Sequence, residues 1–212
     1  PDPWRRRGGA GRRGARRRSD ASDPWAGGLR VLRRWLATRG FGGGISPALP
    51  EGIAACKGAG FDLVIVETSG IGQGDAAIAP LVDVPVYVMT PEFGAASQLE
   101  KIDMLDFAEF VAINKFDRKG ALDALRDVAT QVQRNRQAWG QPAEQMPVFG
   151  TTASRFNDDG VSALYQALTP RLAALGLPLI EGEGRLPFVN TRHSPHQTPV
   201  VPAARTRYLA EI

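Results

Sequence analysis

Short apolar runs along the chain alternate with segments in which apolar residues recur every three or four positions. The runs at residues 63–66, 84–89 and 110–114 are rich in valine and isoleucine and are typical of strands buried on both faces, as in a parallel sheet. A shorter run lies at residues 147–150. The pattern therefore predicts a strand at each of these four places.

The segments between these runs predict helices. A short helix is expected from Pro50 to Ala59, where Gly58 and Gly60 stop it. The apolar positions that predict the other helices are Leu99, Ile102 and Leu105, then Leu122, Leu125, Val128 and Val132, and finally Val161, Leu164, Leu168 and Leu172. Because strands that alternate with helices form βαβ units with right-handed crossovers, we expect an α/β domain over residues 45–176, with three layers and a mostly parallel sheet.

The formal net charge of +4 hides two oppositely charged parts. Residues 1–39 carry twelve arginines and three aspartates, whereas the rest of the chain carries fourteen basic and nineteen acidic side chains. The arginine- and glycine-rich run at residues 5–18 has no apolar periodicity and cannot bury enough surface to offset its ordering entropy. We therefore expect residues 1–44 to be a disordered tail, or sequence that is not native to the protein.

An arginine-rich tail could also bind the phosphates of nucleic acid, which would make the chain a basic binding module. The tail offers few aromatic side chains for base stacking, so nucleic acid is the less favoured partner. Salt-dependent DNA binding by residues 5–18 would favour this alternative.

The strand and helix patterns stop after residue 177. Five prolines follow, together with both histidines of the chain. We interpret residues 177–212 as a linker into a further packed unit, which this chain truncates. His193 and His196 are expected to be solvated linker residues, because no carboxylate or thiolate lies at metal-ligand spacing from them.

Composition excludes several other classes of protein. With Cys56 as its one cysteine the chain can form no internal disulfide, and its two histidines cannot complete a Cys/His zinc site. No run approaches the roughly 20 apolar residues of a membrane span, and the start of the chain lacks an apolar secretory signal. We therefore expect a cytoplasmic protein with no membrane partner. Because the sequence begins with Pro1 rather than methionine, we expect an excerpt of a longer protein.

Candidate chemistry lies where the predicted strands end, since ligands of open α/β sheets bind outside the carboxyl ends of the strands. The run at residues 63–66 leads into Glu67 and then a glycine-rich turn. A carboxylate there can hold magnesium directly or through water, and glycine lets a backbone N–H approach a phosphate. The same residues could also form an ordinary capped turn followed by a flexible loop.

The run at residues 110–114 leads into the tetrad N-K-x-D at residues 114–117. In such a tetrad the aspartate accepts hydrogen bonds from the guanine N1–H and exocyclic amine, the lysine stem lies over the base, and the asparagine braces neighbouring loops. Adenine presents the opposite pattern and is rejected. A charged turn into the next helix is the alternative interpretation.

The fourth strand leads into small residues at positions 151–154, where backbone amides can reach the carbonyl of a base. Together, the three strand ends fit one ligand, a guanine nucleotide with magnesium. A P-loop of the form G-x-x-x-x-G-K-S/T is missing from the sequence. We therefore expect an incomplete nucleotide site, with the P-loop and first switch upstream of this chain.

The motifs together resemble a known family. Residues 64–75, VIVETSGIGQGD, are similar to the magnesium-binding and second-switch segment of the GTPases that accompany cobalamin-dependent acyl-CoA mutases, which belong to the SIMIBI class of P-loop proteins. Residues 89–121, and the closing VVPAARTRYLAEI, resemble the form of this GTPase that is fused within one polypeptide to an isobutyryl-CoA mutase. The resemblance covers residues 45–212 and implies a P-loop GTPase-like fold that lacks its P-loop.

By position, the resemblance implies that Glu67 and Thr68 lie at magnesium, Gly70 at the γ-phosphate and Gln73 near the attacking water. It also implies that residues 91–101 form a third switch, which relays the nucleotide state to the mutase, although an ordinary connection is the alternative. The residues expected at the guanine base are Asn114, Lys115, Phe116, Asp117, Ala153 and Ser154.

The function implied is that of a partial GTPase chaperone domain which gates cobalamin loading in an acyl-CoA mutase. Its cofactors would be GTP or GDP with Mg²⁺, and adenosylcobalamin in the parent, which would be both a GTP hydrolase and an isomerase. Its partners would be the cobalamin-binding and substrate-barrel domains of the same polypeptide, with the parent a homodimer. The fragment by itself is expected to be inactive. The alternative is a stand-alone GTPase metallochaperone, although such proteins often carry cysteine or histidine clusters that this chain lacks.

Overall fold

A computed structural model describes residues 45–68, 76–95, 99–178, 186 and 188–195. Every described residue belongs to one compact unit, Leu36–Ile212. The prediction for residues 1–44 lies outside the described residues, as do those for Gly70, Gln73 and His196.

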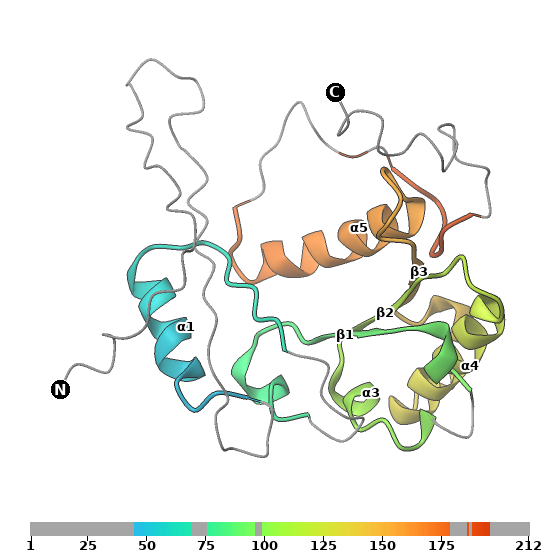
Figure 1. Ribbon diagram of the computed structural model, residues 1–212, viewed down its shortest axis with the longest axis horizontal. Coiled ribbons are helices and arrows are strands. Elements are labelled where there is room, and N and C mark those ends of the chain that lie inside the picture. The colour runs from blue at the N-terminus through green and yellow to red at the C-terminus, as the bar shows by residue number, and fades with distance from the viewer. Residues whose placement is uncertain (1–44, 69–75, 96–98, 179–185, 187, 196–212) are drawn as a thin grey trace, which may run out of the picture. The chain divides into compact units, whose positions relative to one another are not determined.

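The centre of the described fold is a parallel sheet of three strands (Figure 1), in which β1 (Val86–Met89) pairs with β2 (Phe110–Asn114), and β2 pairs with β3 (Val148–Thr151). The strand order is β1-β2-β3, and Ala112 of β2 stands opposite Val88 on one side and Phe149 on the other. Three of the four predicted strands and the parallel arrangement are confirmed.

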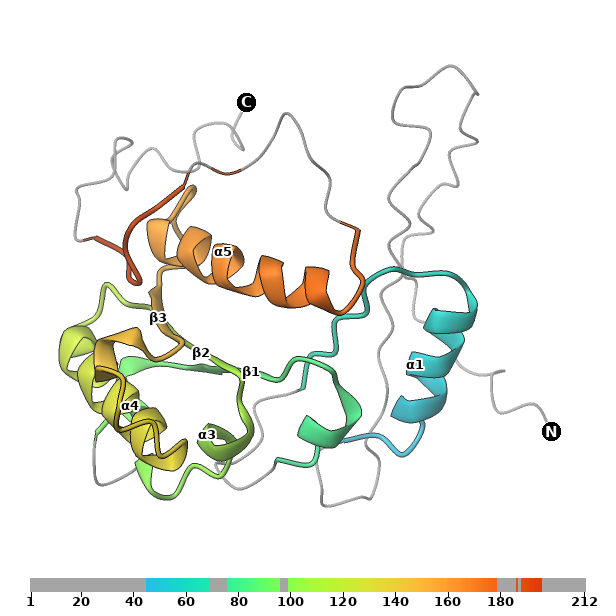
Figure 2. The same ribbon diagram turned by 180° about the vertical axis from the view of Figure 1, so that it is seen from behind.

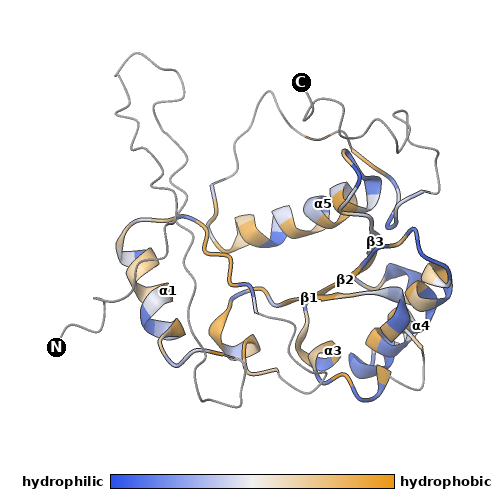
Figure 3. Cartoon of the chain, in the orientation of Figure 1, coloured by the Kyte–Doolittle hydropathy of each residue, from blue (hydrophilic) through white to orange (hydrophobic). Residues whose placement is uncertain are grey.

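Helices lie on both faces of this sheet, as Figures 1 and 2 show from opposite sides. One face packs against α3 (Met104–Phe107) and α4 (Ala121–Asn135), in a core that includes Val111, Ile113 and Val128. The other face packs against α5 (Asp159–Ala174) through Phe110, Phe149 and Ala163. Successive residues of β2 therefore serve opposite faces, and Figure 3 shows hydrophobic colour on parts of the sheet and of the helices beside it. The three-layer α/β prediction is confirmed.

Shorter elements complete the described chain. Helix α1 spans Leu49–Gly58 and ends before Gly60, which has a φ of 75°, so the predicted stop is confirmed. Single 3₁₀ turns lie at η1 (Ala79–Leu81), η2 (Pro91–Phe93) and η3 (Ala143–Gln145). Among the helices of the described residues, none has the length and apolar character needed to cross a membrane.

The helical spacing predicts burial better than it predicts helix limits. Leu99, Ile102 and Leu105 are buried as expected, but α3 begins only at Met104. In α4 the prediction for Leu122 was wrong, because this side chain is exposed. The predictions for Val128 and Val132 are confirmed, and the inward face of α4 also includes Ala121, Ala124 and Ala129. These three small alanines let the helix lie close to its neighbours, and a pattern of large apolar residues does not include them.

The strand predicted at residues 63–66 was wrong. The segment pairs with no strand among the described residues, and Leu63 and Ile65 are 48% and 83% exposed. Val64 and Val66 are half-buried, so burial still alternates as it does along a strand. An apolar run becomes a strand only where another backbone pairs with it, and the sequence of the run does not reveal that partner.

The prediction of a solvated His193 was also wrong. Residues 191–195, here called the docked segment, lie against the edge of β3, where His193 forms a parallel bridge with Gly150. The imidazole stacks on Phe116 with ring centroids 5.4 Å apart. A proline-rich composition marks a segment without regular structure, but such a segment can still pack on a sheet edge whose N–H and C=O groups are unpaired.

Candidate functional site

The candidate site lies where β2 and β3 end. Asn114 is the last residue of β2, Thr151 is the last residue of β3, and the two stand opposite each other in the parallel register. The loops that follow them therefore begin side by side at the carboxyl edge of the sheet, where α/β proteins bind ligands. These loops contain the two motifs that the sequence predicts to bind guanine.

Asn114 joins the two loops. Its side-chain oxygen Oδ1 accepts a hydrogen bond from the backbone N–H of Ala153 at 3.2 Å and one from the hydroxyl of Thr151 at 3.5 Å. A third link runs from the N–H of Phe116 to the carbonyl of Thr151, at 3.0 Å. Asn114 thus braces the neighbouring loop, and this is the role expected for the asparagine of an N-K-x-D tetrad.

The two charged members of the tetrad face outward. Lys115 has a φ of 57°, in the left-handed region that residues other than glycine seldom adopt outside turns and functional sites. Its side chain and that of Asp117 are exposed. Within the described residues, the Asp117 carboxylate accepts no hydrogen bond and forms no ion pair. Both charges are therefore available to a ligand.

Phe116 contributes to the turn from inside the protein. Its ring is completely buried, packs under Gly150, and stacks against His193. The ring therefore cannot lie on a base, and any contribution of Phe116 to nucleotide binding comes through its backbone and through the anchoring of the turn. The sequence predicts Phe116 at the ligand only because this residue lies between Lys115 and Asp117 in the tetrad.

The loop at residues 151–154, called here the base loop, exposes Ala153 and Ser154. The Ala153 N–H is already bonded to Asn114, whereas the Ser154 N–H has no acceptor among the described residues. Thr152 is 1% exposed, and its hydroxyl finds no partner in the described part of the chain. The donor set of this loop fits a ligand that presents a carbonyl oxygen.

Asp158 is a residue that sequence reasoning missed. Its Oδ2 accepts hydrogen bonds from the Val161 N–H at 3.0 Å, which caps α5, and from the Thr152 N–H at 3.1 Å. An aspartate immediately before a helical pattern is a signal for a cap. Nothing in the sequence showed that the same carboxylate would also bind the base loop.

The predicted magnesium residues follow the unpaired segment at residues 63–66. Glu67 is exposed and Thr68 is half-buried, and no hydrogen bond among the described residues joins them to the loops after β2 and β3. In the same described part, no group of three or more histidine, cysteine, aspartate or glutamate side chains is placed to hold a metal ion. An exposed carboxylate beside a hydroxyl does fit the hard oxygen ligands that Mg²⁺ prefers.

The predicted third switch, residues 91–101, contacts the turn that follows β2. The Glu92 carboxylate forms an ion pair with Arg118, the residue after Asp117. Gly94 lies against α4, where an added Cβ would come within 2.4 Å of the Cβ of Ala124. Gln98 lies outside the described residues. The described part of this loop is thus linked to the turn that carries the tetrad.

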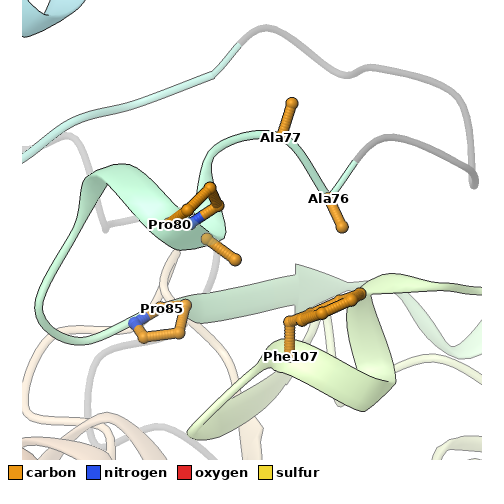
Figure 4. Close-up of a pocket in the computed structure, with 6 residues that line it drawn as sticks. Ala76, Ala77, Pro80, Pro85 and Phe107 are labelled. Atoms are coloured by element: carbon orange, nitrogen blue, oxygen red, sulfur yellow. The ribbon is translucent and has the colours of Figure 1, made fainter.

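A separate pocket of about 490 Å³ lies before the start of β1 (Figure 4). Its lining residues are Ala76, Ala77, Ala79, Pro80, Pro85 and Phe107. Pro85 directly precedes β1, so the pocket is at the amino end of that strand rather than at the carboxyl ends that form the site. The lining has no polar or charged side chain, and we assign no chemistry to it.

Comparison with known proteins identifies the relatives of this domain. The chain matches the family described as Methylmalonyl Co-A mutase-associated GTPase MeaB over residues 3–176, a range that includes most of the arginine-rich segment. It is 63% identical over 211 residues to the fused isobutyryl-CoA mutase of Cupriavidus metallidurans, covering 100% of this chain and 19% of that protein. The corresponding protein of Paraburkholderia xenovorans is 60% identical over 212 residues, with 100% of this chain and 16% of that protein covered.

A third relative, the fused isobutyryl-CoA mutase of Nocardia farcinica, is 60% identical over 211 residues, with coverage of 100% and 19%. The chain therefore spans less than a fifth of the length of these relatives. The resemblance inferred from residues 64–75 and 89–121 is confirmed. Both the family match over most of the sequence and the identity along its whole length show that the chain belongs to the methylmalonyl-CoA mutase-associated GTPase family, MeaB.

Proposed function

We propose that this chain is the guanine-nucleotide domain of a longer acyl-CoA mutase, in which GTP binding and hydrolysis gate the loading of adenosylcobalamin. The observation that carries the proposal is the joined pair of loops after β2 and β3, in which Asn114 fixes the base loop beside the unpaired carboxylate of Asp117. Similarity along the whole of this chain to part of the proteins named fused isobutyryl-CoA mutase supports it.

Recognition of the base follows from the donors and acceptors at the two loops. The Asp117 carboxylate would accept hydrogen bonds from the guanine N1–H and exocyclic amine, and the Ser154 N–H would donate to the carbonyl at C6. The stem of Lys115 would cover the face of the base. Adenine has an amine where guanine has the carbonyl and no N1–H, so it would leave Asp117 without a donor.

The phosphate side of the site rests on fewer described residues. We assign Glu67 and Thr68 to a magnesium ion, which when bound would offset the negative charge of the phosphates. Gly70 would place its N–H at the γ-phosphate, and Gln73 would orient the attacking water. The P-loop that completes such sites is not found in the printed sequence.

Nucleotide state would reach the rest of the protein through residues 91–101. This loop follows β1 and leads to the buried Leu99, Ile102 and Leu105, so a shift at its start could move packed residues. The ion pair between Glu92 and Arg118 connects the loop to the turn that binds the base. The loop is thus suited to act as the third switch rather than as a simple connection.

The partners we propose are a cobalamin-binding domain and a substrate barrel in the same polypeptide, which would act as a cytoplasmic homodimer and rearrange a branched acyl-CoA. Residues 177–212 would lead from the GTPase domain, residues 45–176, into the barrel. The fused architecture of the relatives favours this arrangement over a stand-alone metallochaperone. We assign no nucleic-acid partner, because the family match extends through most of the arginine-rich segment.

Competition between nucleotides tests the proposal. The longer polypeptide that contains this chain and the sequence upstream of it is loaded with fluorescent GDP, which is then displaced with GDP, ADP or XDP. We expect GDP to displace the probe at least about tenfold more effectively than ADP, because a hydrogen bond to a charged group contributes about 1.5–3 kcal/mol. Equal displacement by GDP and ADP would show that the tetrad does not recognise guanine.

A further inference from the structure

The docked segment, residues 191–195, is bonded to the strand that carries the base loop. At Gly150, one residue before the end of β3, the N–H donates to the Arg192 carbonyl at 2.9 Å and the carbonyl accepts from the Ser194 N–H at 2.8 Å. These two bonds continue the sheet by one parallel bridge. The segment therefore lies on β3 directly before the loop that would bind the base.

Ser194 reaches the base loop through Asp158. The Ser194 hydroxyl donates to Asp158 Oδ2 at 2.7 Å, the same oxygen that accepts from the Thr152 N–H. Ser194 is 3% exposed and Asp158 is 6% exposed, so water does not readily replace these bonds. A single buried carboxylate oxygen thus joins the docked segment, the base loop and the start of α5.

Close packing fixes this junction. A Cβ added at Gly160, in the first turn of α5, would come within 1.9 Å of the Gly150 carbonyl oxygen and 2.8 Å of the Ser194 nitrogen. On the other side of β3, the His193 ring stacks on Phe116, which belongs to the guanine tetrad. The docked segment therefore contacts both loops of the site, one through Asp158 and the other through Phe116.

Both ends of the docked segment are also anchored. The Arg192 guanidinium donates to the Gln145 carbonyl at 2.9 Å and lies 5.6 Å from the centre of the Phe149 ring. The Arg155 side chain, which follows the base loop, donates to the Pro195 carbonyl at 3.2 Å. These contacts come from side chains and carbonyls on β3 and its flanking loops, so the segment is held at one place rather than lying along the surface.

We infer that Ser194 is a positioning residue for guanine recognition, and that docking of residues 191–195 on β3 and binding of guanine favour each other. The inference rests on the proposed function, because only that function makes the base loop a part of a guanine site. Ser194 does not touch the ligand. It shares Asp158 with the Thr152 N–H and so fixes the loop whose next residues face the base. Because a coupling between two binding events is reciprocal, guanine must strengthen docking by the same factor by which docking strengthens guanine binding.

Two variants separate this role from a general loss of packing. Ser194→Ala removes the hydroxyl that reaches Asp158. Thr191→Ala removes a hydroxyl from the same segment whose bonds stay within it, to the N–H and carbonyl of His193. In the 212-residue chain without ligand, hydrogen exchange at the Thr152 and Ala153 amides should be about fivefold faster in Ser194→Ala than in Thr191→Ala. The amides of Val111 and Ile113 in β2 report whether both variants remain folded.

Nucleotide binding is then measured in the longer polypeptide. We expect Ser194→Ala to raise the Kd for GDP about fivefold and Thr191→Ala to leave it within about twofold. IDP, which keeps the C6 carbonyl but lacks the exocyclic amine, should lose the same factor as GDP, because the base loop faces the carbonyl. In the unsubstituted protein, GDP should slow exchange of the Ser194 amide, and ADP should not.

The outcomes distinguish the two proposals. If the unsubstituted protein prefers GDP to ADP but Ser194→Ala binds GDP as Thr191→Ala does, the coupling is wrong and the proposed function stands. If exchange at Thr152 and Ala153 is equal in the two variants, Ser194 does not position the loop. If the unsubstituted protein binds GDP and ADP equally, the proposed function fails and the inference fails with it.

Discussion

At the scale of single residues, the tetrad shows what a motif can and cannot tell. The sequence predicted that Asn114 braces a neighbouring loop, and its bonds to Ala153 and Thr151 match that prediction. It did not predict that Phe116 is fully buried, since a tetrad defines the residue types at three positions and leaves the fourth open. The left-handed backbone of Lys115 was equally beyond the motif, because φ depends on how the turn is anchored.

Exchanging the acceptor at Asp117 should change the base that is bound. Asp117→Asn replaces one carboxylate oxygen by a donor, which suits xanthine, whose C2 carbonyl stands where guanine has an amine. We expect the Kd for GDP to rise by about tenfold or more and the Kd for XDP to fall, in fluorescence titrations of the longer polypeptide. Asp123→Asn removes an exposed carboxylate on α4 that pairs with Arg126, and it serves as the control. An unchanged ratio of the two affinities in Asp117→Asn would contradict the assignment.

Tyr87 gives the protein a pH dependence at the alkaline end. Burial raises the pKa of this phenol above its ordinary value of 10.0. The unfolded chain then releases the proton at a lower pH than the native state, so the stabilisation is complete below pH 10 and is lost as the pH rises through the raised pKa.

Tyr87→Phe removes this titration without removing the ring. Urea unfolding at a series of pH values from neutral to alkaline should show a smaller loss of stability above pH 10 in Tyr87→Phe than in the unsubstituted chain. Tyr165→Phe alters a phenol that is 53% exposed and is the matched control. Identical alkaline slopes for the two variants would show that Tyr87 is not protected from ionisation.

At the scale of elements, the sequence predicted the helices and strands that have a pattern of their own. It did not predict which segments pair with a distant part of the chain. The strands β1, β2 and β3 and the helices α4 and α5 follow from patterns within each segment. The run at residues 63–66 is apolar like β2, yet it has no pairing neighbour among the described residues. The docked segment has no strand pattern, yet both the N–H and the carbonyl of Gly150 form hydrogen bonds with it. Pairing at a sheet edge depends on a backbone elsewhere in the chain, which local pattern does not contain.

Close approach between β3 and the tetrad predicts a large effect at Gly150. A Cβ there would come within 2.4 Å of the Phe116 ring, so Gly150→Ala requires Phe116 or β3 to shift. We expect a loss of about 1–3 kcal/mol in the free energy of unfolding, measured by urea denaturation. Gly140→Ala, where an added Cβ meets nothing within 4 Å, is the control. A Gly150→Ala variant as stable as Gly140→Ala would mean that this packing is loose.

At the scale of the whole molecule, the two halves of the nucleotide site differ in how they are built. The half that we propose for the base is assembled by hydrogen bonds between the ends of β2 and β3. The half that we propose for the phosphates would depend on Glu67, which follows a segment with no pairing strand among the described residues, and on a P-loop motif that the sequence lacks. The sequence shows which residue types each half contains. Whether those residues come together depends on the pairing of the strands that carry them.

This difference predicts an inactive fragment. Residues 1–212 alone should not hydrolyse GTP measurably above buffer in a phosphate-release assay, because the phosphate cradle supplies much of the electrostatic stabilisation in phosphoryl transfer. Addition of the upstream family segment in one polypeptide should restore hydrolysis, and Glu67→Ala should then abolish it. Rapid hydrolysis by residues 1–212 that depends on Glu67 would overturn this account of the P-loop.

The open side of β1 has a consequence for handling the isolated domain. Within the described residues β1 pairs only with β2, and Val88, which lies near the end of β1, is 61% exposed. An unpaired apolar strand edge is a template for self-association, so the chain expressed alone should form larger particles as its concentration rises. Val88→Lys should keep the domain monomeric to a concentration about tenfold higher in light scattering, because a charge on an edge strand opposes strand addition. The control is Leu122→Lys, since Leu122 is also exposed but lies on a helix. If both substitutions raise the concentration limit of the monomer equally, the cause is general surface charge and not the strand edge.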